Sequence, residues 1–169
     1  MSTPVSDLHV LANIVVGSDG CTTLNGSSAG LSSAEDRIRF HDLRTRAQFI
    51  VIGGNTARTE PYLKTPVELI VLTHGELPHQ VRGNPLARKF EGSIKEALAT
   101  LHGVVLIEAG PAILLEALAS KLVDELHVTL TKHSTGENCV NFIEMTDGYR
   151  ETSRDVVKDE EFTTFSPSK

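Results

Sequence analysis

Short apolar runs alternate with amphipathic segments along most of this chain. Each run is nearly continuous in apolar side chains and is followed by a polar or glycine-containing turn. Runs of this kind are typical of strands that are buried on both faces of a sheet. The pattern predicts five such strands, over residues 8–16, 49–52, 68–72, 104–107 and 126–130.

Segments with helical periodicity lie between these strands. Ser32 or Ser33 can cap a helix over residues 34–46, whose first turn carries Glu35 and Asp36. Acidic residues in the first turn stabilise a helix because they face the positive end of its dipole.

Two further helices are expected in the second half of the chain. Apolar residues from 94 to 101 recur at i, i+3, i+4 and i+7 behind Ser93, and residues 111–119 form a helix after a tight turn. Strands that alternate with helices predict an α/β fold, with a central, mostly parallel sheet and helices on both faces.

Two segments lack this alternation. Residues 17–33 are dominated by Ser, Gly, Thr, Asp and Asn, which predicts a long surface loop. The tail, 149–165, has strand-like pieces at 155–157 and 162–165 and predicts an antiparallel hairpin on a sheet edge.

Composition narrows the class of protein. The chain has 169 residues, of which 40% are hydrophobic, enough for one globular domain over 1–169 with its core at about 8–166. Sixteen Lys and Arg against 22 Asp and Glu give 16 − 22 = −6, which argues against nucleic-acid or anionic-membrane partners. A phosphate ligand would therefore need a local nest of donors.

Cysteine usage and the chain ends suggest an intracellular protein. Cys21 and Cys139 lie far apart and form no metal-ligand spacing, so we expect reduced thiols in a cytoplasmic protein. Residues 1–7 carry no basic segment before an apolar stretch, and no apolar run is long enough to span a membrane.

No common hydrolase or metal motif is present. The seven histidines form neither HExxH nor the H-x-E and PCxxC pattern of zinc deaminases, and no GxSxG elbow occurs. We therefore expect no metal site.

The clearest chemical signal is the turn that follows the strand at 104–107. Gly110 ends this turn, and Pro111 lies in the first helical turn, where a missing N–H costs little. The N–H groups of Ala112 and Ile113 would then face the carboxyl end of the strand, where a helix N-terminus can receive a phosphate. An ordinary strand-to-helix connection would use the same residues, so the pattern alone leaves both interpretations open.

A second glycine turn follows the strand at 49–52. Gly53 and Gly54 would let a backbone approach a ligand closely, and Thr56 and Arg58 offer a hydroxyl and a cation for phosphate oxygens. A solvated turn explains the same residues. Neither turn is GxGxxG or GxxxxGK, so no dinucleotide fingerprint or P-loop is indicated.

Two carboxylates lie at strand ends. Glu108 follows a central strand at its carboxyl end, where α/β sheets place ligands, although it could simply cap a neighbouring turn. Asp19 precedes Gly20 after the first strand, and Asp-Gly most often marks only a turn.

Several short pieces occur in a fixed order along the chain: Ser18-Asp19-Gly20, Ser33 to Arg44, Gly53 to Pro61, Glu108-Ala109-Gly110-Pro111 and Leu122 to His127. In this order, and over roughly residues 10–131, they resemble the C-terminal reductase domain of riboflavin biosynthesis, the RibD C-terminal family with a dihydrofolate-reductase-like fold. The resemblance implies a cytoplasmic homodimer that reduces the ribosyl group of a phosphoribosylamino-pyrimidine with NADPH, as 5-amino-6-(5-phosphoribosylamino)uracil reductase does.

The resemblance also implies site residues. NADPH performs the difficult step in such chemistry, and the protein mainly orients the reactants. The turns would hold the cofactor's phosphates, and the end of the strand at 68–72 would meet its 2′-phosphate; the implied cofactor residues are Gly53, Asn55, Thr56, Thr73, His74, Gly110, Pro111, Ala112 and Ile113. The implied substrate residues are Asp19, Arg37, Glu60 and Glu108, with Glu108 and Asp19 as the catalytic pair.

The chain departs from the family pattern on the presumed substrate side. Asp-Asp-Pro becomes Glu60-Pro61, and Glu-Gly-Gly becomes Glu108-Ala109-Gly110. Two alternatives therefore stand beside the pyrimidine reductase: a reductase of the same fold with another small carbonyl, imine or pterin-like substrate, and a nucleotide-binding module without turnover.

Overall fold

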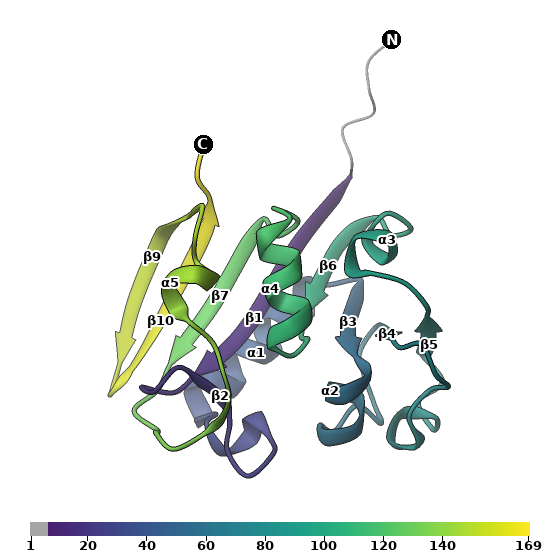
Figure 1. Ribbon diagram of the computed structural model, residues 1–169, viewed down its shortest axis with the longest axis horizontal. Helices are drawn as coiled ribbons and strands as arrows, with labels where there is room; N and C mark the ends of the chain where they lie inside the picture. The colour runs from purple at the N-terminus through teal and green to yellow at the C-terminus, as the bar shows by residue number, and fades with distance from the viewer. Residues whose placement is uncertain (1–6) are drawn as a thin grey trace.

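The main sheet is organised around β1 (Leu8–Val16), which pairs in parallel with one strand on each side. The computed structural model describes residues 7–169, so the expectation that no targeting sequence begins the chain falls largely outside the described residues. The eight strands lie in the order β5-β4-β3-β6-β1-β7-β10-β9 (Figure 1). The other strands of this sheet are β3 (Phe49–Gly53), β4 (Glu68–Leu72), β5 (Ala87–Phe90), β6 (Gly103–Ile107), β7 (Glu125–Leu130), β9 (Tyr149–Val157) and β10 (Glu160–Pro167).

Pairing directions follow the predicted pattern. The six strands from β5 to β7 are parallel, while β10 pairs antiparallel with both β7 and β9. The prediction of an α/β fold with a mostly parallel sheet and an antiparallel C-terminal hairpin is therefore confirmed.

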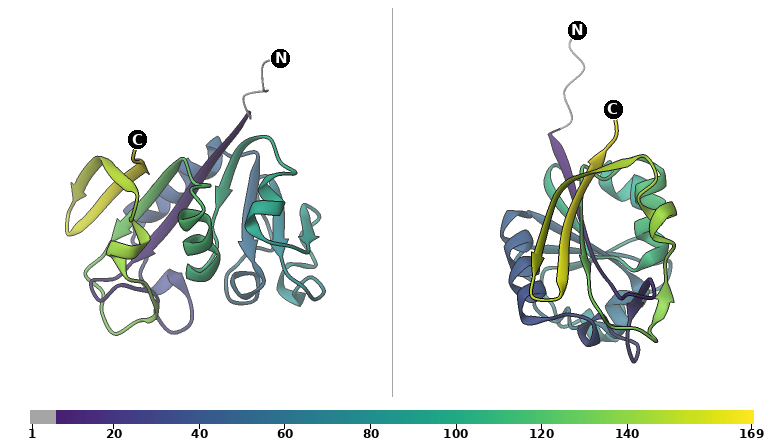
Figure 2. Two further views of the ribbon diagram at one scale, coloured as in Figure 1. Left: turned by 45° about the horizontal axis from the view of Figure 1, so that its top comes forward. Right: turned by 90° about the vertical axis from the view of Figure 1, so that its left-hand side faces the viewer.

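Helices cover both faces of the sheet (Figures 1 and 2). On one face, Leu43 and Ala47, at the C-terminal end of α1, pack with Leu11 of β1 and Leu106 of β6. On the other face, α3 and α4 pack over the alternate residues of the same strands. The helices are α1 (Ala34–Arg46), α2 (Gly54–Thr59), α3 (Ile94–Leu98), α4 (Pro111–Ala119) and α5 (Phe142–Met145), with short 3-10 turns at Ser28–Gly30 and His79–Val81.

The strongest periodic segments form the predicted elements. The helices at 34–46 and 111–119 and the strands at 8–16 and 68–72 have the predicted bounds. The helix expected from 94 to 101 is shorter and ends at Leu98, with its Ser93 cap in place.

The prediction of a long surface loop over 17–33 is wrong in part. This segment contains β2 (Cys21–Thr23), which pairs antiparallel with β8 (Glu137–Cys139) in a separate two-stranded sheet. Each strand has only three residues, and their side chains show no alternation that a sequence pattern could reveal. Their pairing depends on segments that are more than a hundred residues apart.

The expectation of reduced thiols is also wrong in this structure. Cys21 and Cys139 are directly opposite each other in β2 and β8, and their sulfur atoms form a disulfide. The sequence separation of 118 residues hides this proximity, because only the folded sheet brings the two strands together. No helix of the described residues is long and apolar enough to cross a membrane.

A polar seam joins α1 to the sheet. The hydroxyl of Thr129 in β7 donates to the buried Asp36 carboxylate at 2.6 Å. Farther along the seam, Glu125 accepts hydrogen bonds from Arg46, and its oxygens lie 3.0 Å from Nε2 of His9 and 3.0 Å from Nε2 of His127. Burial alone would raise the pKa of Glu125, but bonds from Arg46 and the two histidines outweigh it and lower this pKa to about 2.

The Glu125 seam predicts an acid-sensitive contribution to stability. The folded pKa of Glu125 lies below its ordinary value of 4.5, so its contribution is present above pH 4.5 and is lost as the pH falls towards about 2. Because the carboxylate is partly exposed, we expect Glu125→Gln to lower the free energy of unfolding by roughly 1–2 kcal/mol at pH 7. The difference from wild type should vanish near pH 2.

Urea unfolding of both proteins across this pH range measures the effect. Glu116→Gln is a matched control, because Glu116 lies exposed on α4 outside the seam. A constant difference between Glu125→Gln and wild type at all pH values would contradict the assigned role of the carboxylate.

Candidate functional site

The carboxyl ends of the parallel strands meet at one edge of the sheet, the lower edge in Figure 1. The turns after β1, β3, β4, β6 and β7 all emerge there. Open α/β sheets bind ligands at this edge because loops and helix N-termini expose backbone donors there. The predicted cofactor residues come from the turns after β3, β4 and β6.

Contacts between these turns are close. A Cβ atom at Gly53 would lie 2.6 Å from Cδ1 of Ile113, so the turn after β3 touches the first turn of α4. A Cβ atom at Gly54 would lie 3.4 Å from Oγ1 of Thr73, which joins the end of β4 to the same group. Three segments predicted separately from the sequence are thus neighbours.

Gly110 has no structural need to be glycine. Its φ of −65° is allowed to every residue, and a Cβ atom there would make only an ordinary contact, at 3.6 Å from Oγ1 of Thr56. No side chain caps α4. Among the described residues, none accepts a hydrogen bond from the N–H of Ala112 or Ile113. The space beside Gly110 and the free donors suit a phosphate group.

The remaining predicted cofactor residues, Asn55 and His74, lie after β3 and after β4. Asn55 is in α2, where its Oδ1 accepts a hydrogen bond from Arg58 at 3.0 Å. The segment after β3, for which a solvated turn was one of two interpretations, forms α2, and its six residues carry no side-chain cap. His74 follows Thr73 and is exposed to solvent.

Glu108 is buried on the α1 side of the sheet. Its two carboxylate oxygens accept hydrogen bonds from Nε and Nη2 of Arg44, at 2.8 and 2.7 Å. The hydroxyl of Tyr62 donates to the same carboxylate at 2.5 Å. Burial, together with the Glu108 carboxylate, raises the pKa of Tyr62, so this phenol remains a donor. Glu108 is therefore the centre of a buried ion pair, rather than a turn cap.

Arg44 is held from several directions. Its guanidinium stacks over the ring of Phe40, 4.3 Å from the centroid, in addition to its bonds with Glu108. Burial alone would lower the pKa of Arg44, but Glu108 outweighs it and raises this pKa. Arg44 and Tyr62 are the partners that sequence reasoning missed. Their signal is weak, because an Arg in a helix and a Tyr in a loop have no fixed spacing from Glu108.

The other predicted substrate residues are bonded to their own chain. Asp19 accepts backbone hydrogen bonds from Cys21 at 3.1 Å and from Gly136 at 2.9 Å. These backbone bonds lower the pKa of Asp19. Asp19 therefore links the turn after β1 to the segment after β7, and it does not touch Glu108 in this structure.

Glu60 and Arg37 also make local contacts. Glu60 accepts hydrogen bonds from the Ser28 N–H at 2.7 Å and from the Ser27 hydroxyl at 3.0 Å. Arg37 donates to the carbonyl of Ser33 at 3.2 Å and is largely exposed. Four predicted substrate residues therefore occupy distinct places around one edge, and the structure does not gather them into a single cluster.

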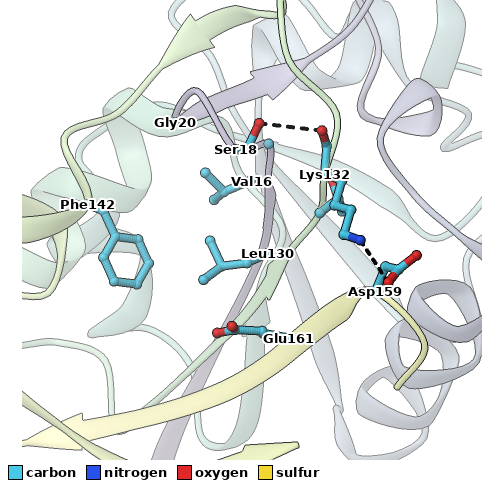
Figure 3. A pocket seen from close by; sticks show the side chains of 10 residues that line it. Val16, Ser18, Gly20, Leu130, Lys132, Phe142, Asp159 and Glu161 are labelled. Atoms are coloured by element: carbon cyan, nitrogen blue, oxygen red, sulfur yellow. Dashed lines mark hydrogen bonds and ion pairs between the residues drawn. The ribbon is translucent and has the colours of Figure 1, made fainter. Parts of the chain in front are cut away.

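A pocket of about 390 Å³ opens on the α5 side of this edge. Figure 3 shows Val16, Leu130 and Phe142 lining its apolar part, and the ion pair of Lys132 with Asp159 at 2.7 Å lying at one side. None of the predicted site residues lines it. Glu108 contacts α1, on the opposite face of the sheet, so the pocket and the Arg44–Glu108 ion pair are separate features.

No group of three or more His, Cys, Asp or Glu side chains within residues 7–169 is arranged to hold a metal ion. The candidate site consists of backbone donors, hydroxyls and the Arg44–Glu108 pair.

Three solved structures share this arrangement of elements. Acinetobacter baumannii RibD superposes with a TM-score of 0.75 and 16% identity, over 95% of this chain and 58% of that one. A pyrimidine reductase-like protein from Corynebacterium diphtheriae has a TM-score of 0.74 and 17% identity, over 95% and 92% of the two chains. Dihydrofolate reductase from Enterococcus faecalis, complexed with NADP(H) and RAB-propyl, has a TM-score of 0.71 and 19% identity, over 95% and 97%.

These likenesses establish the dihydrofolate-reductase-like fold. The chain spans a little over half the length of the A. baumannii RibD chain. No curated protein matches the sequence. The family model of the RibD C-terminal domain, in contrast, matches residues 8–144, which is most of the chain. The chain belongs to the RibD C-terminal domain family.

Proposed function

We propose that this protein is an NADPH-dependent reductase of the riboflavin-biosynthesis type, acting on a phosphoribosylamino-pyrimidine. The observation that carries the proposal is the open N-terminus of α4 beside Gly110, at the edge where the turns after β3 and β4 also meet. Family membership supports the reaction class, and the E. faecalis neighbour is a complex with NADP(H).

The free donors of α4 are the proposed pyrophosphate site. The N–H groups of Ala112 and Ile113 and the positive end of the helix dipole attract a phosphate, while Gly110 leaves space for it. The Thr56 hydroxyl lies beside Gly110 and offers one more donor. The fold itself does not require glycine at 110, so a ligand that approaches the backbone explains the residue best.

The proposed 2′-phosphate site lies at the end of β4. Thr73 provides a hydroxyl near Gly54, and the exposed His74 can add a donor. A group that contacts only the 2′-phosphate favours NADPH over NADH.

When bound, NADPH supplies the hydride. The protein's own contribution is to hold the acceptor carbon of the substrate near the cofactor and to exclude alternative orientations. The carboxylate of Glu108 has about four acceptor positions and uses three of them on Arg44 and Tyr62. Only 2% of the Glu108 side chain is exposed, so a sugar hydroxyl reaches the fourth position only if the substrate enters beside Arg44, whose side chain is 14% exposed.

A nucleotide-binding module without turnover is the second candidate. The specific observation in its favour is that Asp19, Glu60 and Glu108 all bond to groups of their own chain. A reductase of another small carbonyl, imine or pterin-like compound is the third. NADPH oxidation measured against a panel of small carbonyl, imine and pterin-like compounds, including the phosphoribosylamino-pyrimidine and dihydrofolate, separates the three, because the module oxidises NADPH with none of them.

The location and assembly state complete the proposal. We propose a cytoplasmic protein that forms a homodimer; the dimer follows from the family resemblance. Light scattering of the purified protein tests the dimer, and a monomeric mass would refute it.

The pyrophosphate site predicts a defined loss of cofactor affinity. Gly110→Val places a branched side chain where the phosphate approaches, so calorimetric titration should give an NADPH Kd at least tenfold weaker, about 1.4 kcal/mol. Gly110→Ala should weaken binding less. Ala99→Val is the control, because Ala99 is exposed at the end of α3, near the opposite edge of the sheet. Wild-type protein that releases no saturable heat with millimolar NADPH would refute the proposal.

The 2′-phosphate site predicts a change in cofactor preference. Thr73→Val keeps the shape of the side chain and removes its hydroxyl, which should weaken NADPH binding about tenfold, the value of a hydrogen bond to a charged group. NADH binding should remain the same. Calorimetry with both cofactors gives the ratio of their affinities. An equal loss for NADPH and NADH would show that Thr73 contacts a part common to both.

The Arg44–Glu108 pair predicts separate effects on stability and turnover. Glu108→Gln removes a buried charge opposite Arg44 and should lower the free energy of unfolding by about 2 kcal/mol. Turnover per folded molecule should fall at least tenfold with little change in NADPH affinity, because an amide accepts fewer hydrogen bonds.

Tyr62→Phe is the stability control for this experiment. It removes one hydrogen bond to Glu108, leaves the ion pair, and should cost about 1 kcal/mol. Unchanged turnover per folded molecule in Glu108→Gln would mean that the carboxylate serves stability alone.

A further inference from the structure

A covalent link closes the small sheet beside the turn after β1. The Cys21–Cys139 disulfide joins β2 to β8, and each of these strands has three residues. A two-stranded ribbon of this size is marginally stable by itself in water. The covalent link is therefore a major constraint on the two segments, which are 118 residues apart in the sequence.

The two cysteines differ in exposure. Cys21 is buried, with 4% of its surface exposed, whereas Cys139 is exposed to solvent. A thiolate reductant can therefore approach Cys139 from solvent, and the Cys21 sulfur would be the leaving group. Both sulfurs are used in the bond, and the chain has no other cysteine that could rearrange with them.

The segment that leads to Cys139 is held in an unfavourable backbone conformation. Thr135 and Asn138 have φ angles of 63° and 53°, in the left-handed region. This region is tolerated by Asn but is unusual for a β-branched residue such as Thr. The strained backbone persists because surrounding contacts hold it, so it should relax when the main constraint is removed.

The same constraint acts on Asp19. The two backbone donors of this carboxylate belong to Cys21 and to Gly136, which lie on the two segments that the disulfide joins. The pocket of Figure 3 is lined by Gly20, which precedes Cys21, and by Phe142, which follows Cys139 by three residues. The other ties between the two segments are hydrogen bonds, among them those from the Val140 N–H to the Gly20 carbonyl at 2.8 Å and from the Ser18 N–H to the His133 carbonyl at 2.7 Å. Opening the disulfide therefore leaves the clamp on Asp19 and this side of the pocket to non-covalent contacts alone.

We propose that the Cys21–Cys139 disulfide is a reversible redox switch that fixes the Asp19 turn and the rim of this pocket when oxidised and releases them when reduced. The reductant is a thiol of the glutathione kind or a dithiol. Its thiolate attacks the Cys139 sulfur and forms a mixed disulfide, and the Cys21 thiolate leaves and takes up a proton. A second thiolate, from another monothiol molecule or from the same dithiol, then attacks the reductant's sulfur in the mixed disulfide. Cys139 leaves as a thiolate and takes up a proton, so that two electrons and two protons convert the protein disulfide into two thiols and the reductant becomes a disulfide.

The proposed cytoplasmic location favours this role. Disulfides in reducing compartments are usually transient, catalytic or redox-sensing, because thiol pools keep most cysteines reduced. The switch itself does not depend on catalysis. Only its effect on turnover rests on the proposed function, through Asp19.

Hydrogen exchange of the full chain in both redox states tests the switch. Incubation in glutathione buffers with an increasing excess of the reduced form, followed by thiol alkylation, should show a loss of the disulfide and the gain of two thiols. In the reduced protein, amides of residues 17–24 and 132–140 should exchange at least tenfold faster. Amides of β6 and α4 should be unchanged, and NADPH should bind with the same affinity in both states.

Two variants complete the design. Cys139→Ser should show the fast exchange of the reduced protein with and without reductant. Ser134→Ala changes an exposed residue of the same loop and should behave as wild type. Three results would each overturn the switch. The disulfide could stay intact when reduced glutathione predominates, the protein could keep two free thiols under oxidising conditions, or the exchange rates could be equal in both states. If neither state binds NADPH but exchange changes as expected, the proposed function fails and the switch stands.

Discussion

The parallel register between β3 and β6 fixes the position of the two glycine turns that form the proposed cofactor site. Three residue pairs define it, from Phe49 with Val105 to Val51 with Ile107, and the Glu108 N–H continues the ladder by donating to the Val51 carbonyl at 3.0 Å. Both strands therefore end side by side, and both glycine turns begin there. A slip of one residue would turn Glu108 from the α1 face to the opposite face and separate it from Arg44.

The two faces of the sheet then acquire different characters. Apolar packing dominates the face under α3 and α4. The face under α1 combines a small apolar cluster with the polar seam of Asp36, Thr129 and Glu125 and the ion pair of Arg44 with Glu108. Buried polar groups of this kind are costly unless they are fully bonded, and each of these has partners. The position of α1, and with it the direction of Arg44, follows from these bonds.

The fold could be predicted from local patterns because the strands and helices are strongly periodic. Ser33 capping α1 and Pro111 beginning α4 gave clear boundaries. β2 and β8 could not be predicted, because each is too short for periodicity and their pairing spans more than a hundred residues. The disulfide was missed for the same reason. α2 was missed because its Gly-Gly start, which leaves the helix uncapped, is more typical of a turn.

The candidate site was predictable only in part. The glycine turns could be located because each follows directly on a predicted strand, and the structure brings Gly53, Thr73 and Ile113 together. The surroundings of Glu108 were not predictable, because its partners Arg44 and Tyr62 come from other segments, 64 and 46 residues away in sequence. Long-range pairing of charges leaves no periodic signal in a single sequence.

We propose that the edge formed by the turns after β3, β4 and β6 binds the pyrophosphate of a nicotinamide cofactor. Titration of isotope-labelled protein with NADP⁺, followed by amide chemical shifts, tests this binding site residue by residue. The largest saturable shifts are expected at Gly110, Ala112 and Ile113, with smaller ones at Gly54 and Thr56, because in the proposed complex these N–H groups face the phosphates. Shifts confined to the pocket between Gly20 and Phe142, or no saturable shift at millimolar NADP⁺, would contradict it.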